Sequence, residues 1–284
     1  ALAQTAQQRG HTVTIAGDRR PPDNLSFIHL HDLSPGALVM ALQATKPDWL
    51  IVDLPGDLPG WIRELTPCKI CTLNGIGYNQ NDLADLRVVQ GVDDVDLPGP
   101  QDKVPVLKGI EYVILRPEIE QFKGMARSQD FLCWGGGADI LHLLHRFTVA
   151  CPGWFATLIT SPMAPAPLLV SPTHTIIRLN EESTDIFGWM AGSRAACVAM
   201  GMCVWELLAV GPIPTYVFSA TPLHLRFAEA MARRGLIKAW PTVGLPSNEE
   251  VKAFLSEPFE PDVRNLPDGN GATRVMEQIE NYAH

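Results

Sequence analysis

The stretch AACVAMGMCVWELLAVGPIP, residues 195–214, contains the signal that decides the fold. It is about 20 residues long and almost wholly apolar, which is the length that a bilayer requires. However, Gly201, Glu206, Gly211 and two prolines interrupt it, and its first half favours a strand while its second half favours a helix. A buried strand, a tight turn and a buried helix therefore explain this stretch better than a membrane span.

The composition is typical of a globular protein and excludes several classes of partner. The 284 residues, of which 46% are hydrophobic and 19% charged, are enough for two domains of roughly 100–150 residues each. The formal net charge of −9 offers no basic surface for nucleic acid. Six cysteines are too few for a disulfide framework. We expect a cytoplasmic protein without a membrane span, as a monomer or weak homo-oligomer.

Strand patterns alternate with helical patterns along the chain, which predicts an α/β fold with parallel sheets. We expect two doubly wound, Rossmann-like domains, residues 1–120 and residues 121–284, with a last helix over 272–283. The predicted strands are 12–16, 26–30, 49–53, 69–73, 87–90, 131–135, 154–160, 175–178, 195–200 and 214–219. The other predicted helices are 2–9, 35–44, 140–151, 184–190, 203–210, 223–234 and 247–255.

The first predicted helix, residues 2–9, comes before the first predicted strand. In a doubly wound sheet, a strand and a loop normally precede such a helix, and phosphates or catalytic groups lie at that loop. We therefore expect a strand and a glycine-rich loop upstream of Ala1, so that the first domain lacks its first strand in this sequence.

The turn at Gly201 is the strongest candidate for a binding site. A strand that turns directly into a helix leaves several backbone N–H groups, here from Gly201 to Val204, without intrahelical partners, and the helix dipole favours an anion there. Glu206, one turn further on, could accept hydrogen bonds from ribose hydroxyls. A plain buried turn with Glu206 at the domain surface explains the same residues equally well.

Three other groups of residues have types and positions that bear on chemistry. Gly136 and Gly137 belong to a triple glycine that follows a predicted strand, where the backbone can approach a ligand closely. His224 follows another strand at a helix start, where it could act as general acid, general base or phosphate ligand, or could cap the helix. Cys68 and Cys71 would point to opposite faces of one strand, so we expect no metal site.

Several segments match those of a known family in the same order. They are residues 2–16 and 49–53, the motif Leu-Arg-Pro-Glu within 112–118, the strand and glycines of 131–137, residues 195–214 with Gly-x-x-x-Trp-Glu, and the tail 268–274. In these segments the chain resembles the UDP-sugar hydrolase of pseudaminic acid biosynthesis and the related spore-coat polysaccharide proteins. The resemblance implies the two-domain GT-B glycosyltransferase fold, in which the two domains face a cleft and the C-terminal helix closes the second domain.

The resemblance also implies an activity and a site. UDP would lie in the second domain, with Gly201, Met202, Cys203 and Glu206 at the diphosphate and ribose and Ile186 against the base. Water would attack the anomeric carbon and release UDP without a cofactor, in the synthesis of nonulosonic acids for cell-surface glycans. A loop histidine upstream of Ala1 would activate that water.

The sequence departs from the family at two places. Leu54-Pro55 stands where the family has an aromatic residue, and Leu223-His224 stands where it has an Asn-Gln pair. A UDP-sugar hydrolase is our first hypothesis; the alternatives are a GT-B glycosyltransferase that uses a UDP-sugar donor and a non-catalytic nucleotide-sugar-binding relative. His224 is the one catalytic candidate. The expected nucleotide-binding residues are Gly136, Gly137, Ile186, Gly201, Met202, Cys203, Val204, Glu206 and His224.

Overall fold

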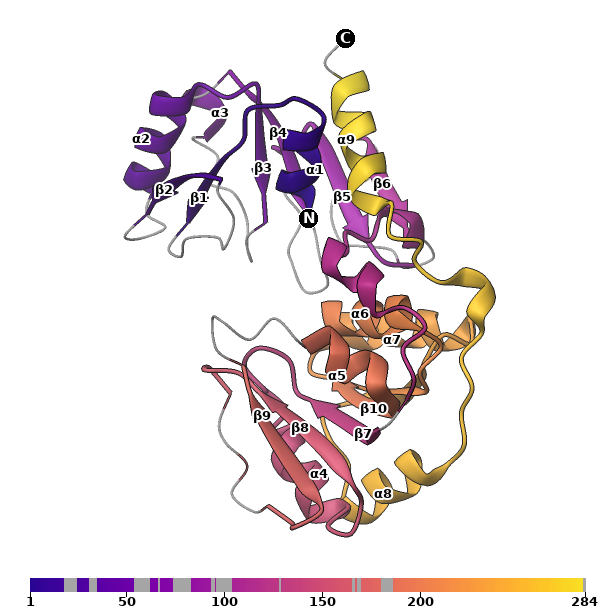
Figure 1. The fold of residues 1–284 in the computed structure, drawn as a ribbon. Helices are drawn as coiled ribbons and strands as arrows, with labels where there is room; N and C mark the ends of the chain where they lie inside the picture. The colour runs from indigo at the N-terminus through magenta and orange to yellow at the C-terminus, as the bar shows by residue number, and fades with distance from the viewer. Residues whose placement is uncertain are drawn as a thin grey trace. The chain divides into compact units, whose positions relative to one another are not determined.

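The computed structural model describes residues 1–17, 25–30, 35–53, 62–65, 67–73, 83–92, 95, 104–127, 129–164, 167, 170–179 and 186–282. The chain divides into two compact units, which are described separately (Figure 1). Unit 1 comprises Ala1–Gly91, Asp96–Ile114 and Asn270–His284, and unit 2 comprises Val92–Val95 and Leu115–Gly269. The departure at Leu54-Pro55 lies outside the described residues.

Unit 2 is a Rossmann-like domain built on one parallel sheet. The strand order is β12-β11-β10-β7-β8-β9, and each neighbouring pair is parallel. This is the 3-2-1-4-5-6 arrangement of a doubly wound sheet, in which the strand order reverses between β7 and β10. The strands are β7 (Gln129–Trp134), β8 (Ala156–Thr160), β9 (His174–Arg178), β10 (Ser193–Ala199), β11 (Thr215–Ser219) and β12 (Lys238–Val243).

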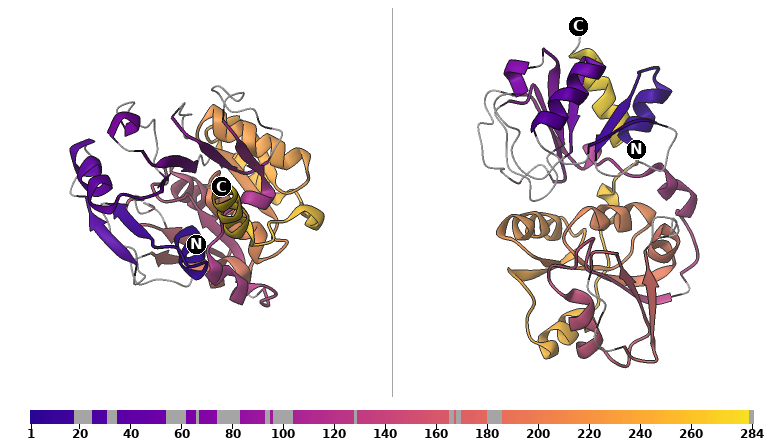
Figure 2. Two further views of the ribbon diagram at one scale, coloured as in Figure 1. Left: turned by 90° about the horizontal axis from the view of Figure 1, so that it is seen from above. Right: turned by 90° about the vertical axis from the view of Figure 1, so that its left-hand side faces the viewer.

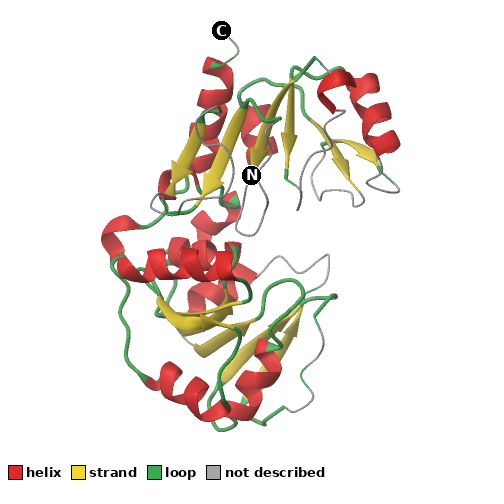
Figure 3. Ribbon diagram, turned by 180° about the vertical axis from the view of Figure 1, so that it is seen from behind, coloured by secondary structure: helices red, strands yellow, loops and turns green. Residues whose placement is uncertain are grey.

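Helices cover both faces of the unit 2 sheet (Figure 3). One face carries α5 (Ile186–Gly192), α6 (Met202–Val210) and α7 (Pro222–Arg233), and the other carries α4 (Leu143–Ala150) and α8 (Asn248–Ser256). Aromatic side chains fill the core on the second side, among them Phe131, Phe147, Tyr216 and Phe254. Both faces are thus buried, which explains the continuous apolar runs of these strands.

Residues 195–214 form the predicted strand, turn and helix. β10 ends at Ala199 and α6 begins at Met202. Trp205, Leu207 and Leu208 on α6 are fully buried, so the apolar character of this stretch serves the core of unit 2. None of the helices in the described residues has the length and apolarity to cross a membrane.

Unit 1 contains a four-stranded sheet in the order β3-β4-β5-β6 and a two-stranded sheet, β1-β2. All of the pairs are parallel. The strands are β1 (Thr14–Gly17), β2 (Ser26–His29), β3 (Trp49–Val52), β4 (Lys69–Leu73), β5 (Leu86–Gln90) and β6 (Val106–Gly109), and two further helices are α2 (Pro35–Thr45) and α3 (Ile62–Leu65). Short 3₁₀ turns η1 (Ile110–Tyr112) and η2 (Pro117–Phe122) follow β6, and η3 (Val263–Asn265) precedes the last helix.

The two ends of the described chain pack together in unit 1. α1 (Leu2–Gln8) and α9 (Gly271–Asn281) share one hydrophobic cluster with buried residues of β4 and β5 (Figures 1 and 2). We expected the last helix to close the second domain, whereas its apolar residues Val275, Met276 and Ile279 pack in unit 1. The reason is that the apolar face of α9 is buried against α1, β4 and β5, although these elements are far from α9 in the sequence.

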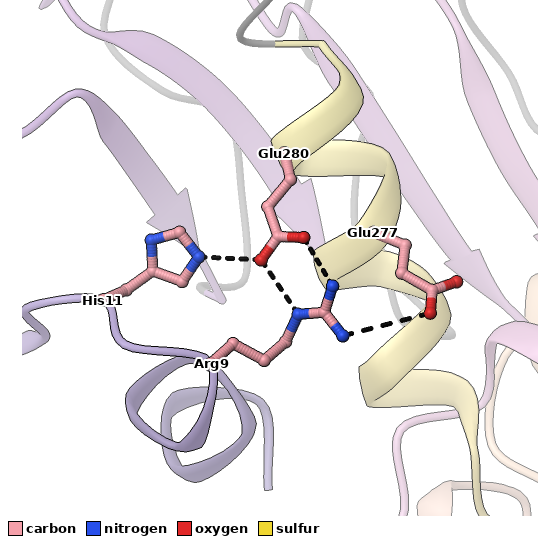
Figure 4. Close-up of polar contacts among 4 residues, drawn as sticks. All are labelled: Arg9, His11, Glu277 and Glu280. Atoms are coloured by element: carbon pink, nitrogen blue, oxygen red, sulfur yellow. Dashed lines mark hydrogen bonds and ion pairs between the residues drawn. The ribbon is translucent and has the colours of Figure 1, made fainter.

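A cluster of charges also ties α9 to the end of α1 (Figure 4). The Arg9 guanidinium donates to both carboxylate oxygens of Glu280, at 2.8 and 2.5 Å, and lies 3.9 Å from Glu277. His11 Nε2 lies 2.8 Å from Glu280 Oε1. Hydrogen bonds from Arg9 and His11 lower the pKa of Glu280 to about 2.

All ten predicted strands occur, with ends shifted by a few residues. β6 and β12 were not predicted. The helix expected over residues 140–151 begins instead at Leu143, because Asp139 and His142 have φ angles of 43° and 52° and cannot continue a right-handed helix. The strand expected upstream of Ala1 stays a prediction.

Candidate functional site

A pocket of about 380 Å³ lies in unit 2 at the carboxyl ends of β7, β10 and β11. Open parallel sheets bind ligands at this end, beside the point where the strand order reverses, and here that point lies between β7 and β10. The volume falls in the range of small-molecule pockets. The lining residues come from four segments: Arg116, then 134–141, then 199–203 with Glu206, and Ala220 with His224.

Gly201 joins β10 to α6 and lines this pocket. Its φ of 174° is extended backbone that any residue can adopt, and a Cβ placed on it would meet no atom within 4 Å. Neither strain nor packing therefore requires a glycine here. What glycine provides is access, because the backbone at the N-terminus of α6 stays open to a bound group.

The amide groups that follow Gly201 differ in their availability. Met202 and Cys203 lie in the first turn of α6, where backbone N–H groups have no intrahelical acceptor, and both residues line the pocket. The N–H of Val204 donates to the carbonyl of Gly201 at 3.1 Å, and Val204 is fully buried. The amides at the start of α6 that line the pocket are thus those of Met202 and Cys203.

Glu206 lies one turn into α6 and is only 7% exposed. Arg116 donates to its Oε1 from Nε at 3.0 Å and from Nη2 at 2.9 Å. Burial raises the pKa of the Glu206 carboxyl, while the charge and hydrogen bond of Arg116 act in the opposite direction. The alternative that placed Glu206 at the domain surface is wrong, because this carboxylate is buried and lines the pocket.

The glycine loop after β7, residues 135–137, also lines the pocket. A Cβ on Gly135 would lie 1.9 Å from Oδ1 of Asp139, so this position requires glycine. Asp139 is buried and accepts hydrogen bonds from the N–H groups of Leu143 and Leu144, at 2.7 and 3.3 Å, which caps α4. Burial raises the pKa of the Asp139 carboxyl. Gly136 has a φ of 82°, which favours glycine.

His224 lines the pocket from the first turn of α7. The capping role considered for it belongs to Thr221, whose hydroxyl accepts a hydrogen bond from the His224 N–H at 3.1 Å. Its imidazole is therefore not needed as the helix cap. The His224 side chain lines the pocket instead.

Seven of the nine predicted nucleotide-binding residues line this one pocket: Gly136, Gly137, Gly201, Met202, Cys203, Glu206 and His224. Ile186 is buried at the start of α5 and Val204 is buried within α6, and neither lines the pocket. Sequence reasoning missed Arg116, Trp134 and Asp139 as lining residues. A signal for Arg116 existed in the Leu-Arg-Pro-Glu motif, but its partner lies 90 residues away.

The cysteine pair Cys68 and Cys71 lies in the interior of unit 1. Cys71 lies in β4 and Cys68 just before it, and both are buried. Burial raises the pKa of the Cys71 thiol to about 12, so this thiol stays protonated. No group of three His, Cys, Asp or Glu side chains that could hold a metal ion occurs in the part of the chain that the structure describes.

Comparisons with known proteins identify the fold. No family model matches the chain, and no curated protein matches it in sequence. Among solved structures, it is similar to the glycotransferase of kitacinnamycin, at 14% identity, TM-score 0.65, with 99% of this chain and 94% of that chain covered. It is also similar to UGT89C1 of Arabidopsis thaliana complexed with UDP-L-rhamnose, at 12% identity, TM-score 0.56, with 99% and 89% covered.

A third similar structure is the spinosyn rhamnosyltransferase SpnG complexed with thymidine diphosphate, at 15% identity, TM-score 0.55, with 99% of this chain and 91% of that chain covered. These similarities support the glycosyltransferase-like fold that the resemblance implied, and they do not support the hydrolase or the pseudaminic acid family. The chain has the GT-B glycosyltransferase fold, with two Rossmann-like domains.

Proposed function

We propose that this chain is a glycosyltransferase that binds a nucleoside diphosphate sugar in the pocket of unit 2. The observation that carries the proposal is the spacing within α6. The amides of Met202 and Cys203 and the carboxylate of Glu206 line the same pocket, one helical turn apart. The amides can donate hydrogen bonds to a diphosphate, and the carboxylate can accept hydrogen bonds from the hydroxyls of the adjacent ribose.

The electrostatics fit a diphosphate next to a polyol. Helix N-termini bind phosphate through backbone N–H groups and the helix dipole, without a lysine or arginine. Gly201 leaves this end of the helix open to close approach. Glu206 would repel a phosphate if the two were in contact, so its place further along α6 suits the neutral hydroxyls of the sugar ring of the nucleoside.

Transfer to a hydroxyl acceptor is favoured over hydrolysis by the similar structures, whose names are those of transferases. In such a transfer, the bond between the anomeric carbon and the phosphate oxygen breaks and a bond to the acceptor oxygen forms. The acceptor proton passes to a base, and the nucleoside diphosphate leaves with the bonding electrons. The α6 amides, and His224 when protonated, would stabilise the charge that develops on that leaving group.

Calorimetry with the full chain tests the binding step. UDP, dTDP and their glucose esters are titrated into the wild-type chain, into Glu206→Gln, and into Glu229→Gln, a matched change on the exposed side of α7. We expect binding by the wild type and by Glu229→Gln, and an affinity roughly 10- to 150-fold lower in Glu206→Gln, from the 1.5–3 kcal/mol of a hydrogen bond to a charged group. Equal affinity in all three proteins would contradict the proposed site.

The transfer step is tested by following the sugar. The wild-type chain is incubated with the sugar nucleotide that binds best, alone and with a panel of small alcohols and phenols. Release of nucleoside diphosphate that requires an acceptor, together with a glycosylated acceptor in the mass spectrum, supports a transferase. Release at the same rate in water alone would favour the hydrolase instead.

A further inference from the structure

The two most distinctive sequence motifs of the chain meet at one ion pair. Arg116 belongs to the Leu-Arg-Pro-Glu segment, and Glu206 belongs to the Trp-Glu segment of α6. Arg116 and Glu206 both line the pocket of unit 2. The geometry of their ion pair indicates what the arginine does there.

Arg116 engages only one side of the carboxylate. Both of its contacts, from Nε at 3.0 Å and from Nη2 at 2.9 Å, go to Oε1 of Glu206. Among the described residues, no hydrogen bond to Oε2 is formed. A carboxylate has about four acceptor positions on its two oxygens, so Oε2 remains available to a ligand while Oε1 is fixed.

The guanidinium is itself held in place by its surroundings. Its central carbon lies 4.2 Å from the centroid of the Phe187 ring on α5, within the range of a cation–π contact. Phe187 is 2% exposed and packs near Phe122 at the end of η2. Pro117 follows Arg116 and restricts its backbone to the extended conformation that is observed, φ −67° and ψ 132°. Both the backbone and the side chain of Arg116 are therefore preorganised.

We infer that Arg116 is a positioning residue: it holds Glu206 through Oε1, so that Oε2 faces the pocket as a fixed acceptor for a ribose hydroxyl. This inference rests on the proposed function, because it assumes a nucleotide in the pocket. Recognition of a ribose hydroxyl by Glu206 then depends on Arg116, which need not touch the nucleotide itself.

Loss of Arg116 should change the pH range over which Glu206 is protonated, which a purely structural role would not do. Glu206 is buried, and Arg116 is the residue whose charge and hydrogen bond oppose the effect of burial on its pKa. The other titratable groups that line the pocket are Asp139, Cys203 and His224. The described part of α5 has none, and Glu118 and Glu120 on η2 are exposed. Removing Arg116 should therefore leave Glu206 protonated over a wider pH range, and a protonated carboxyl is a weaker acceptor.

The experiment measures the affinity for UDP-glucose between pH 5 and pH 8.5 in the wild type, Arg116→Gln, Arg116→Lys and the double variant Arg116→Gln/Glu206→Gln. Both phosphates of UDP-glucose are esterified, so the probe itself does not titrate through neutrality. Arg127→Gln is the matched control, because Arg127 is exposed in the same unit and donates to the Pro212 carbonyl, away from Glu206. In parallel, the carboxyl carbon of Glu206 is titrated by NMR without ligand, identified as the signal that Glu206→Gln lacks.

We expect the affinity of Arg116→Gln to rise with pH, with a midpoint about one to three pH units above that of the wild type, which is the shift that a neighbouring opposite charge produces. The ligand-free titration of Glu206 should move by the same amount. Arg116→Lys should return most of the way to the wild type, Arg127→Gln should match it, and the double variant should lose the midpoint that belongs to Glu206.

Two results would count against separate claims. If the wild type binds UDP-glucose but Arg116→Gln, though folded, keeps both midpoints, Arg116 does not position Glu206 and the proposed function stands. If the wild type binds neither UDP-glucose nor dTDP-glucose at any pH, the proposed function fails, and the ribose role of Glu206 fails with it.

Discussion

Two glycines that line the pocket should respond in opposite ways to the same added methyl group. Gly201→Ala places a Cβ where no atom lies within 4 Å, on backbone that alanine can adopt. Alanine is a poorer N-cap than glycine, but it also restricts the unfolded chain, so we expect the free energy of unfolding to change by less than about 1 kcal/mol. The methyl group instead occupies space that a diphosphate needs. Overpacking of about 1–3 kcal/mol would lower the affinity roughly 5- to 150-fold.

Gly135→Ala should show the reverse order of effects. Its Cβ would lie 1.9 Å from Oδ1 of Asp139, so Asp139 must leave the N–H groups of Leu143 and Leu144. Loss of such a cap costs about 0.5–2 kcal/mol, which lowers the melting temperature by roughly 1–8 °C for a domain of this size. Denaturant titrations and calorimetry with UDP-glucose on both variants separate stability from binding. Unchanged affinity in a folded Gly201→Ala would refute the idea that the ligand approaches this backbone.

Three further predictions concern single positions. If protonated His224 supports the diphosphate, the affinity for UDP-glucose should fall as the pH rises from about 5.5 to 8.5, a range around the ordinary histidine pKa. His224→Gln should flatten that pH profile. A profile that the substitution leaves unchanged would exclude this role. The pKa of Glu280 is lowered to about 2, so its contribution to stability is present above the unfolded pKa near 4.5 and is lost as the pH falls toward 2. The difference in melting temperature between the wild type and Glu280→Gln should therefore shrink between pH 7 and pH 3. A constant difference would contradict the ion pair. Gly271→Ala should destabilise the chain, because its Cβ would lie 2.1 Å from the backbone carbonyl oxygen of Val113; a melting temperature equal to that of the wild type would show that this contact is absent in solution.

The sequence was sufficient for most of the fold because the strands of the three sheets in the described residues are mostly short apolar runs between turn residues. β6 was missed because its four residues, VLKG, include a lysine and a glycine. β12 was missed because Pro241 interrupts it, which an edge strand tolerates. The start of α4 was misplaced because the left-handed conformations of Asp139 and His142 leave no clear signal in the sequence.

The candidate site was predicted only in part, for a related reason. Gly201 and Glu206 are close in sequence, so the spacing of a strand–turn–helix indicates their chemistry. Arg116 reaches Glu206 from 90 residues away, and no periodicity encodes that contact. Thr221, whose hydroxyl accepts a hydrogen bond from the His224 N–H, was not predicted as the cap of α7, because the helix was expected to begin at residue 223 and begins at Pro222.

The return of α9 to unit 1 also determines the order in which the protein can be completed during synthesis. Most of unit 1 is translated first, yet part of the apolar cover over β4 and β5 comes from Ala272, Val275, Met276 and Ile279. All of unit 2 leaves the ribosome before these residues do. The pairing of Arg9 with Glu280 then closes a separation of 271 residues. Nascent unit 1 must therefore keep an apolar face accessible while its neighbour folds, and the half that is made first is the last to be finished.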